Sequence, residues 1–225
     1  MWDRSRRDSP LAFLGQTPLS ALSSGVGILH EKLAFTRRVG VLSDWFARLA
    51  PAQARVLDVG CGDGMVSALL QAKRPDLDIT GIDVLCRKNA HIPVEIFDGT
   101  RIPFRDDSFD LILFSDVLHH TEDPIVLQRE ARRVARHVLM KDHYLQGWAA
   151  AQRLRFMDWT GNARFGVALP YNYWTESQWK KAWEEIGLRP EQVVTRLGLY
   201  PAPANWIFGA QLQFIALLKK CDPSH

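Results

Sequence analysis

The chain has 225 residues, of which 47% are hydrophobic and 24% are charged. These proportions are ordinary for a globular domain with a sizeable core and exclude a chain that is disordered throughout. Its formal net charge of +3 is too small to require a nucleic-acid or membrane partner. The length fits one domain of α/β size.

The cysteines and the N-terminal segment indicate the compartment. Cys61, Cys86 and Cys221 are odd in number and irregularly spaced, so they predict neither a disulfide framework nor a zinc site. Residues 1–25 mix acidic with basic residues and interrupt their apolar stretch with Gly and Pro, unlike a signal peptide. We interpret this segment as a loose arm. No window reaches the roughly 18 apolar residues of a membrane-spanning helix, which favours a cytoplasmic protein.

Up to residue 143, the apolar residues alternate between the periods of helices and of strands. Spacings of mostly three and four from Leu33 to Leu49 predict an amphipathic helix over residues 29–50, which Pro51 ends. Strands are then expected at residues 55–59, 79–84, 94–97, 109–114 and 137–140, and helices at residues 66–72 and 123–135. This alternation implies a doubly wound, mostly parallel sheet with helices on both faces. The link at residues 85–93 is short for a crossover helix.

The last part of the chain, residues 144–225, holds six of the eight tryptophans and all four tyrosines. Helices are expected at residues 144–159 and 176–185, loops at 161–173 and 201–209, and strands at 193–199 and 211–218. Thr175 and Gln178 match a capping box at the start of the second helix. Trp179 and Trp183 stand four apart on one face of that helix, which predicts that both are in the core. The two late strands would close the sheet in antiparallel fashion.

A glycine-rich turn, with Gly60, Gly62 and Gly64, follows the first strand. Glycine lets the backbone pass close to a ligand, and the start of the next helix favours a carboxylate or phosphate. A dinucleotide fingerprint needs Gly-x-Gly-x-x-Gly, but here the third glycine comes one residue early and Met65 stands in its place. The spacing therefore disfavours a nicotinamide oxidoreductase.

Two acidic residues follow the next two strands. The carboxylate of Asp83 could accept both hydroxyls of a ribose, and Asp98 could accept from an adenine amino group. Ligands bind beyond the carboxyl ends of the strands in such sheets, so the glycine turn and both acids would face one site. The alternative is three ordinary turns, since Gly and Asp are common turn residues.

Together these motifs resemble the core of class I S-adenosylmethionine-dependent methyltransferases, in the branch that includes ubiquinone- and menaquinone-biosynthesis-like enzymes. The matching pieces are residues 56–64, 81–83, 98–99, 102–104, 108–110 and 115–120. The resemblance implies a seven-stranded sheet whose last strand is antiparallel. We expect a single domain overall, with residues 1–50 as an arm and cap helix. Residues 51–225 would form the methyltransferase domain, with an aromatic-rich insertion at about 144–175.

The resemblance also implies S-adenosylmethionine as cofactor. Its methionine moiety would lie over the glycine turn, its ribose would meet Asp83, and its adenine would lie near Val84 and Asp98. The cofactor-binding residues expected are Asp58, Gly60, Cys61, Gly62, Asp83, Val84, Asp98, Gly99, Ser115 and His120. Within this set, Cys61 is interpreted as a small packed residue and not as a nucleophile.

Methyl transfer to a hydroxyl is helped by a general base. The catalytic candidates are His119, which follows the fourth strand, and Asp142 and His143, which follow the fifth. Each could instead order its loop or shape the cofactor pocket. No metal site is expected, because adjacent histidines such as His119 and His120 would point in different directions and Asp123 stands where a helix cap is wanted.

The acceptor site is expected between the fifth strand and the next one, where insertions in such enzymes commonly cover it. Trp159, Tyr171 and Tyr173 suit a pocket for a flat or apolar small molecule, although packing explains them equally well. Arg37 and Arg38 could meet an acidic acceptor, but a solvated helix face explains them better.

The sequence thus predicts a methyltransferase acting on an aromatic or apolar small molecule, with no metal and no nucleic-acid partner. One alternative is a tRNA or protein methyltransferase; a tRNA enzyme would be expected to carry a basic stripe or a further domain. Another is a non-catalytic S-adenosylmethionine-binding partner subunit, against which the complete set of motifs argues.

Overall fold

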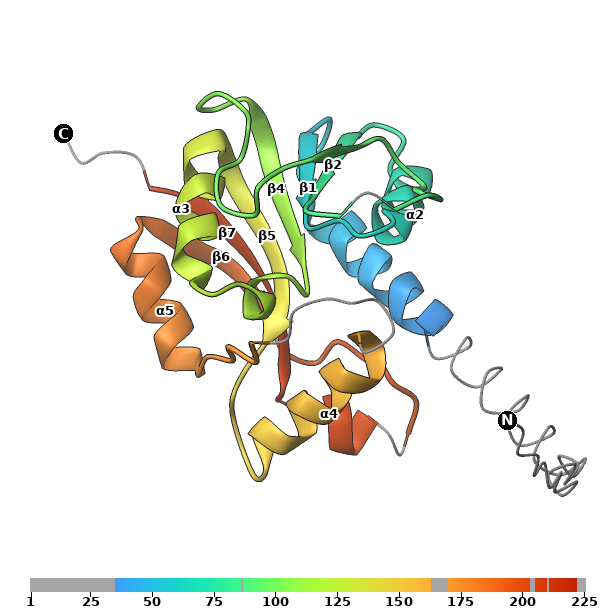
Figure 1. Ribbon diagram of the computed structural model, residues 1–225, viewed down its shortest axis with the longest axis vertical. Coiled ribbons are helices and arrows are strands. Elements are labelled where there is room, and N and C mark those ends of the chain that lie inside the picture. The colour runs from blue at the N-terminus through green and yellow to red at the C-terminus, as the bar shows by residue number, and fades with distance from the viewer. Residues whose placement is uncertain (1–34, 86, 163–169, 203–204, 210, 222–225) are drawn as a thin grey trace, which may run out of the picture. The chain divides into compact units, whose positions relative to one another are not determined.

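The computed structural model describes residues 35–85, 87–162, 170–202, 205–209 and 211–221 (Figure 1). The arm expected over residues 1–34, Cys86 and residues 163–169 of the expected loop lie outside the described residues. The chain divides into two units, Met1–Thr36 and Arg37–His225. The sheet and the site belong entirely to the second unit.

A seven-stranded sheet forms the centre of this unit. Its strands are β1 (Arg55–Val59), β2 (Asp78–Asp83), β3 (Val94–Ile96), β4 (Phe109–Ser115), β5 (Ala135–His143), β6 (Leu188–Val194) and β7 (Gln213–Lys220). Their order across the sheet is β3-β2-β1-β4-β5-β7-β6. The first five pair in parallel, whereas β7 runs antiparallel to both β5 and β6. This confirms the expected sheet and gathers the carboxyl ends of β1, β2, β4 and β5 along one edge.

The strands bury side chains on both faces. Along β4, Leu111 and Leu113 belong to one core, and Ile112 and Phe114 belong to the opposite core. This is the two-residue period of a strand. All four side chains are fully buried, as a near-continuous apolar run in a parallel strand requires.

The helices are one over residues 35–49, α2 (Met65–Lys73), α3 (Pro124–Val134), α4 (Ala150–Asn162) and α5 (Glu176–Glu185), with a short 3₁₀ turn η1 (Leu118–His120) and a π-helical turn η2 (Asn205–Gly209). All of these helices except α4 cover the two faces of the sheet. Phe46 and Leu70 share the core of Leu111. Leu127 of α3 and Trp183 of α5 lie in the opposite core.

The caps of α3 and α5 agree with the sequence. The Asp123 side chain accepts a hydrogen bond from a backbone N–H in the first turn of α3. Thr175 and Gln178 form the reciprocal capping box of α5. Trp179 and Trp183 are buried, as expected of core residues.

The strand expected over residues 193–199 is wrong, because β6 occupies Leu188–Val194 instead. It is an edge strand with mostly exposed side chains, and its pairing with β7 shifts register after Pro190. Edge strands tolerate proline, and an exposed strand has no buried apolar run to reveal it. Gly187, with φ +69°, lets the chain turn directly from α5 into this strand.

The fifth strand is longer than expected. It continues to His143 because β7 pairs with it as far as the partners His143 and Gln213. Asp142 and His143 therefore end a buried strand instead of starting a loop. The next helix, expected from residue 144, begins only at Ala150.

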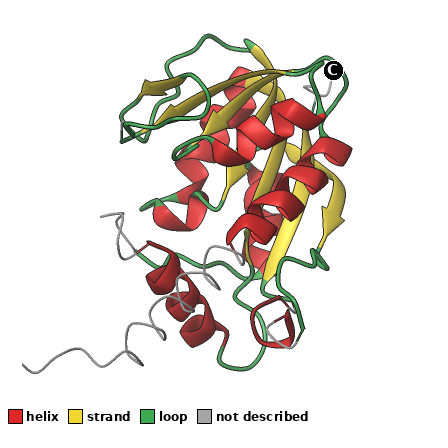
Figure 2. Cartoon of the chain, turned by 90° about the vertical axis from the view of Figure 1, so that its right-hand side faces the viewer, coloured by secondary structure: helices red, strands yellow, loops and turns green. Residues whose placement is uncertain are grey.

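The segment that follows β5 lies at the edge where the parallel strands end. Figure 1 and Figure 2 both show α4 beyond the carboxyl ends of β4 and β5. In the link between β2 and β3, residues 85 and 87–93 contain no helix, in agreement with its shortness. Within the part of the chain that the structure describes, no helix has the length and apolar character to cross a membrane.

Candidate active site

The turn after β1 adopts a backbone that only glycine adopts easily. Gly60, Gly62 and Gly64 have φ values of +73°, +62° and +74°, in the left-handed region where a Cβ is costly. A Cβ on Gly60 would also lie 2.7 Å from the Val117 side chain. The turn therefore brings bare backbone to the start of α2, where a ligand can approach closely.

Asp83, at the end of β2, links the glycine turn to the turn that follows β2. Its carboxylate accepts hydrogen bonds from the backbone N–H of Gly62 at 2.8 Å and of Leu85 at 2.9 Å. Each carboxylate oxygen has a second lone pair. The acid is thus fixed in place while it retains capacity to accept further hydroxyl donors.

Asp58 is the buried acid of the turn. Its Oδ2 accepts a hydrogen bond of 2.6 Å from the Ser67 hydroxyl, whereas its Oδ1 has no partner among the described residues. Burial raises the pKa of Asp58 to about 7. A buried, unpartnered carboxylate oxygen fits a cationic donor such as the ammonium group of an amino acid.

The remaining residues expected at the cofactor are arranged around this turn. Val84 is half exposed, and Asp98 accepts the backbone N–H groups of Thr100 and Arg101 through Oδ1, which lowers its pKa. Gly99 has φ +82° and packs near Val84. Cys61 occupies the space that a Cβ on Gly81 would need, Ser115 pairs with Lys141 between β4 and β5, and His120 ends η1.

A largely buried ion-pair network lies between the ends of β4 and β5. Asp116 forms ion pairs with Arg38 and with Lys141, whose side chain is 0% exposed. Burial opposes the ionisation of Asp116, but these two cations hold its pKa well below the ordinary value. The sequence prediction that Arg38 lies on a solvated helix face is therefore wrong.

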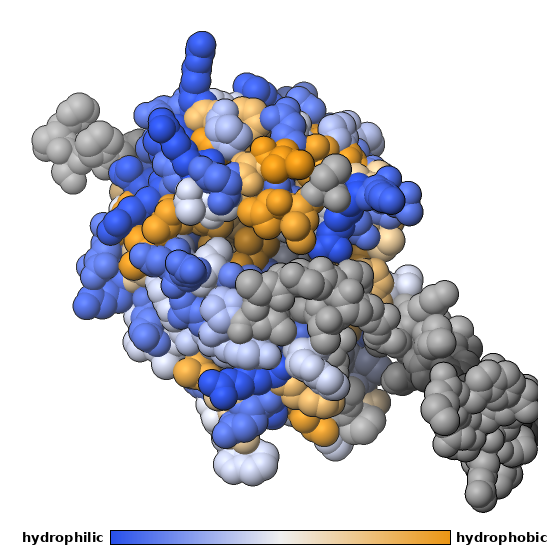
Figure 3. Space-filling model, in the orientation of Figure 1, coloured by the Kyte–Doolittle hydropathy of each residue, from blue (hydrophilic) through white to orange (hydrophobic). Residues whose placement is uncertain are grey.

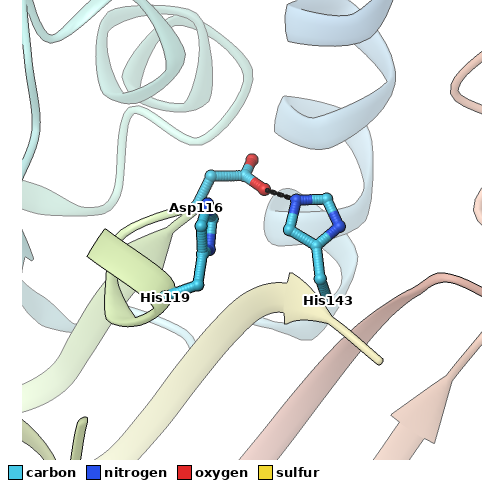
Figure 4. A group of neighbouring side chains, drawn as sticks. All are labelled: Asp116, His119 and His143. Carbon is cyan, nitrogen blue, oxygen red and sulfur yellow. Dashed lines mark ion pairs between the residues drawn. The ribbon is translucent and has the colours of Figure 1, made fainter. Parts of the chain in front are cut away.

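His143 contacts the same carboxylate (Figure 4). Its Nε2 lies 3.2 Å from Asp116 Oδ1, and its Nδ1 is buried without a hydrogen-bond partner among the described residues. Burial and the nearby Lys141 lower the pKa of His143. The geometry thus gives a neutral imidazole whose proton is on Nε2 and whose Nδ1 lone pair is free.

A second buried group surrounds His119. Its Nδ1 lies 2.7 Å from Asp142 Oδ1 and its Nε2 lies 3.4 Å from Asp158 Oδ2. Burial alone would favour the neutral ring, but the two carboxylates raise the pKa of His119 to about 10. The Tyr173 hydroxyl also donates to Asp158.

His120 lies beside His119. Their ring centroids are 4.1 Å apart, so the expectation that the two rings point in different directions is wrong. Burial and the neighbouring His119 lower the pKa of His120 to about 4. The tight η1 turn is what brings two consecutive imidazoles together.

Of the three residues expected at the acceptor, one lies in the buried group around His119 and the other two are more exposed. Tyr173 is buried against His119, whereas Trp159 on α4 is 58% exposed. Tyr171 lies between them in burial, with the Arg155 guanidinium 5.5 Å from its ring centroid.

The sequence interpretation also missed Asp116, Lys141 and Asp158. Asp116 and Lys141 stood beside residues already singled out, but nothing distinguished Asp158.

Comparison with known proteins agrees with this geometry. The family model for the methyltransferase domain matches residues 34–193. The chain is 31% identical over 110 residues to the 27-O-demethylrifamycin SV methyltransferase of Amycolatopsis mediterranei, a match that covers 42% of this chain and 40% of that protein. It is 34% identical over 87 residues to the demethylmenaquinone methyltransferase of Thermotoga maritima, covering 36% of this chain and 38% of that protein. The matched regions thus span about two fifths of these relatives' length.

The fold is also similar to that of solved structures. One is a chain in the complex that contains the Haloferax volcanii Trm112 methyltransferase activator, with a TM-score of 0.62 and 14% identity, covering 86% of this chain and 94% of that chain. The sheet order and the glycine turn define the class I, Rossmann-like methyltransferase fold. The chain belongs to the methyltransferase domain family, and S-adenosylmethionine is the cofactor of this family.

Proposed function

We propose that this chain transfers a methyl group from S-adenosylmethionine to a small aromatic or apolar acceptor with a dissociable proton, such as a hydroxyl. One observation carries the proposal. The glycine turn after β1 and the buried His143 at the end of β5 stand at the same edge of the sheet, with only β4 between the two strands. A cofactor site beside a proton acceptor is what methyl transfer to a hydroxyl requires.

The residues around the glycine turn would hold the cofactor, which supplies an activated methyl group when bound. The free Oδ1 of Asp58 is suited to its ammonium group, and Asp83 is suited to its ribose hydroxyls. The exposed Val84 offers an apolar surface for the adenine. Gly60 and Gly62 leave space for the methionine moiety because neither carries a Cβ.

His143 is the strongest candidate for the general base. Its Nε2 faces Asp116, which fixes the tautomer and leaves the Nδ1 lone pair free for an acceptor proton. By contrast, both ring nitrogens of His119 face carboxylates. Asp142 accepts from His119 and from the backbone of Leu118. We therefore assign Asp142 and His119 positioning roles.

The aromatic-rich segment over residues 144–175 would cover the acceptor. Its helix α4 lies beyond the ends of β4 and β5, and exposes Phe156 and Trp159. In Figure 3, apolar side chains reach the surface in the lower part of the molecule, where Figure 1 places α4 and η2. The helix over residues 35–49 would close the site from another side, since Arg38 reaches Asp116.

Two alternatives have some support. They are methylation of a protein or tRNA and a role as a non-catalytic subunit, and the Haloferax volcanii structure, a complex with a methyltransferase activator, supports a partner protein for a chain of this fold. The small net charge and the deep burial of His143 favour a small acceptor, because a macromolecule would have to insert its target group among buried side chains.

The experiment that tests the proposal is transfer of label from methyl-labelled S-adenosylmethionine. The purified chain is incubated with a cell extract divided into low-molecular-weight, RNA and protein fractions. We expect label in the low-molecular-weight fraction, in a product heavier by one methyl group. Label only in RNA or protein would contradict the small acceptor. Binding of S-adenosylhomocysteine without transfer to any fraction would favour the non-catalytic role.

A further inference from the structure

We propose that His119, His120 and Asp158 bind a first-row divalent transition-metal ion. One ligand atom from each residue lies within 4.8 Å of the other two. Two imidazoles and one carboxylate form a ligand set that leaves coordination positions open for water or substrate. His119 and His120 come from the η1 turn and Asp158 from α4, so the fold itself assembles the set.

The distance between His119 and Asp158 matches two ligands of one ion. His119 Nε2 and Asp158 Oδ2 are 3.4 Å apart, in ion-pair contact, and Nε2 makes no other contact of this kind among the described residues. Two ligand atoms about 2.0–2.1 Å from a tetrahedral ion are roughly 3.3–3.4 Å apart. Both side chains are at least nine-tenths buried.

The opposite nitrogen of His119 is held as in known metal sites. Its Nδ1 lies 2.7 Å from Asp142 Oδ1, and Asp142 is itself fixed by the backbone N–H groups of Leu118 and His143. Metal-binding histidines usually donate their second ring N–H to a carboxylate, which leaves the other nitrogen as an oriented lone pair. Here a metal ion that displaces the Nε2 proton would bind on the side of Asp158. The Tyr173 hydroxyl, which donates to Asp158, supports that carboxylate in the same way.

His120 supplies the second imidazole. Its Nδ1 is buried and has no hydrogen-bond partner among the described residues. Buried polar atoms are nearly always paired, so this unpartnered nitrogen needs an explanation. A metal ion held together with His119 and Asp158 would give His120 a partner.

The His119 ring lies between two buried carboxylates, those of Asp142 and Asp158. A divalent ion bound at Nε2 would take the place of a proton on that ring, because a metal ion binds the deprotonated imidazole. A second possible ligand group, formed by Asp116, His119 and His143, is less suited, since its carboxylate already pairs with Arg38 and Lys141.

A metal ion here would lie near the proposed base. The His119 and His143 ring centroids are 4.8 Å apart. An ion with an open position could bind the acceptor oxygen and make its proton easier to remove. This catalytic use rests on the proposed function, whereas metal binding itself does not.

The test measures binding and not turnover. The full chain is stripped with a chelator and titrated with Co²⁺ by visible absorption and with Zn²⁺ by calorimetry. We expect one equivalent of each ion to bind, with d–d bands from Co²⁺. His120→Ala and Asp158→Asn should each weaken binding by more than about 100-fold, beyond the effect of losing an outer partner. His91→Ala, at an exposed histidine, should leave binding unchanged.

No Co²⁺ bands and no Zn²⁺ heat with the wild-type chain would overturn the site, and so would unchanged affinity in both ligand variants. Circular dichroism shows whether each variant is folded. If both are unfolded, Asp142→Asn replaces them, and it should weaken binding by about 10–100-fold because it removes the partner of His119 Nδ1. Unchanged affinity in that variant would also overturn the site. Metal binding without methyl transfer would refute only the proposed function.

Discussion

His143 Nε2 lies 3.2 Å from Asp116 Oδ1, a contact that joins the end of β5 to the residue following β4. Asp116 is also the common partner of Arg38 and Lys141. One carboxylate therefore pairs with two cations and fixes the tautomer of one imidazole. Both the stability of this edge of the sheet and the proposed base depend on it.

Asp116→Asn should destabilise the fold. The substitution leaves the fully buried Lys141 without its counter-charge, and breaking a buried ion pair costs about 3–5 kcal/mol. We expect the free energy of unfolding in urea to fall by at least about 2 kcal/mol, since asparagine still offers a hydrogen-bond acceptor. Glu185→Gln, which breaks an exposed pair with Lys181, is the control and should change it by less than about 0.5 kcal/mol. Equal stability of the two variants would contradict the buried network.

Gly60→Ala should weaken cofactor binding by more than backbone strain alone explains. A Cβ there would lie 2.7 Å from Val117, whereas a Cβ on Gly198, with a similar φ of +70°, would meet nothing within 4 Å. Both variants carry the left-handed strain of about 1–2 kcal/mol. We expect only Gly60→Ala to weaken S-adenosylhomocysteine binding in calorimetry, by tenfold or more. Similar affinities would show that the turn does not lie against the ligand.

Binding of S-adenosylhomocysteine should weaken in acid. The pKa of Asp58 is raised by burial from 3.8 to about 7, so its carboxyl takes up a proton as the pH falls through 7. Pairing with the ligand ammonium requires the ionised form, so affinity should fall by up to about tenfold per pH unit below pH 7. Calorimetry between pH 5 and 8 measures this, and Asp58→Asn should flatten the profile.

The same carboxyl affects unfolding with the opposite sign. Because its pKa is higher in the folded state, its contribution to stability is present below about pH 4 and is lost as the pH rises to about 7. Asp78→Asn, at an exposed position, is the control for both profiles. An affinity independent of pH in the wild-type chain would argue against ionised Asp58 at the ammonium group.

Trp159→Ala should raise the KM for the acceptor without changing stability. Trp159 is 58% exposed on α4, so its removal creates no cavity. Loss of an aromatic contact of about 1 kcal/mol would raise KM roughly fivefold. Trp148→Ala, at a residue that is 87% exposed and outside the predicted set, should leave KM unchanged. A change in both variants, or in neither, would remove Trp159 from the acceptor site.

The cofactor half of the molecule could be predicted from sequence because its signals are local. The central parallel strands contain short apolar runs, Gly60 follows β1 directly, and Asp83 is the last residue of β2. The edge strand β6 could not be predicted, because Pro190 and its exposed neighbours carry no apolar period. Local pattern indicates where a buried strand ends, but it does not reveal a strand with both faces exposed to solvent.

The polar groups around Asp116 and His119 depend on contacts between distant parts of the chain. Arg38 reaches Asp116 from a helix 78 residues earlier. Asp158 meets His119 only because α4 lies beyond the ends of β4 and β5. The histidines and Asp142 were found because they were expected to follow strands, whereas Asp116 and Asp158 were not singled out. Their roles could therefore be assigned only once the fold was known.

The rate of methyl transfer by His143→Gln tests the account most directly. The acceptor-containing extract fraction and labelled cofactor are used with the wild-type chain, His143→Gln and, as control, His137→Gln, at the opposite end of β5. We predict a rate about 100-fold or more lower for His143→Gln, with S-adenosylhomocysteine affinity within about twofold of wild type, and a normal rate for His137→Gln. A wild-type rate in His143→Gln would contradict its role as the base.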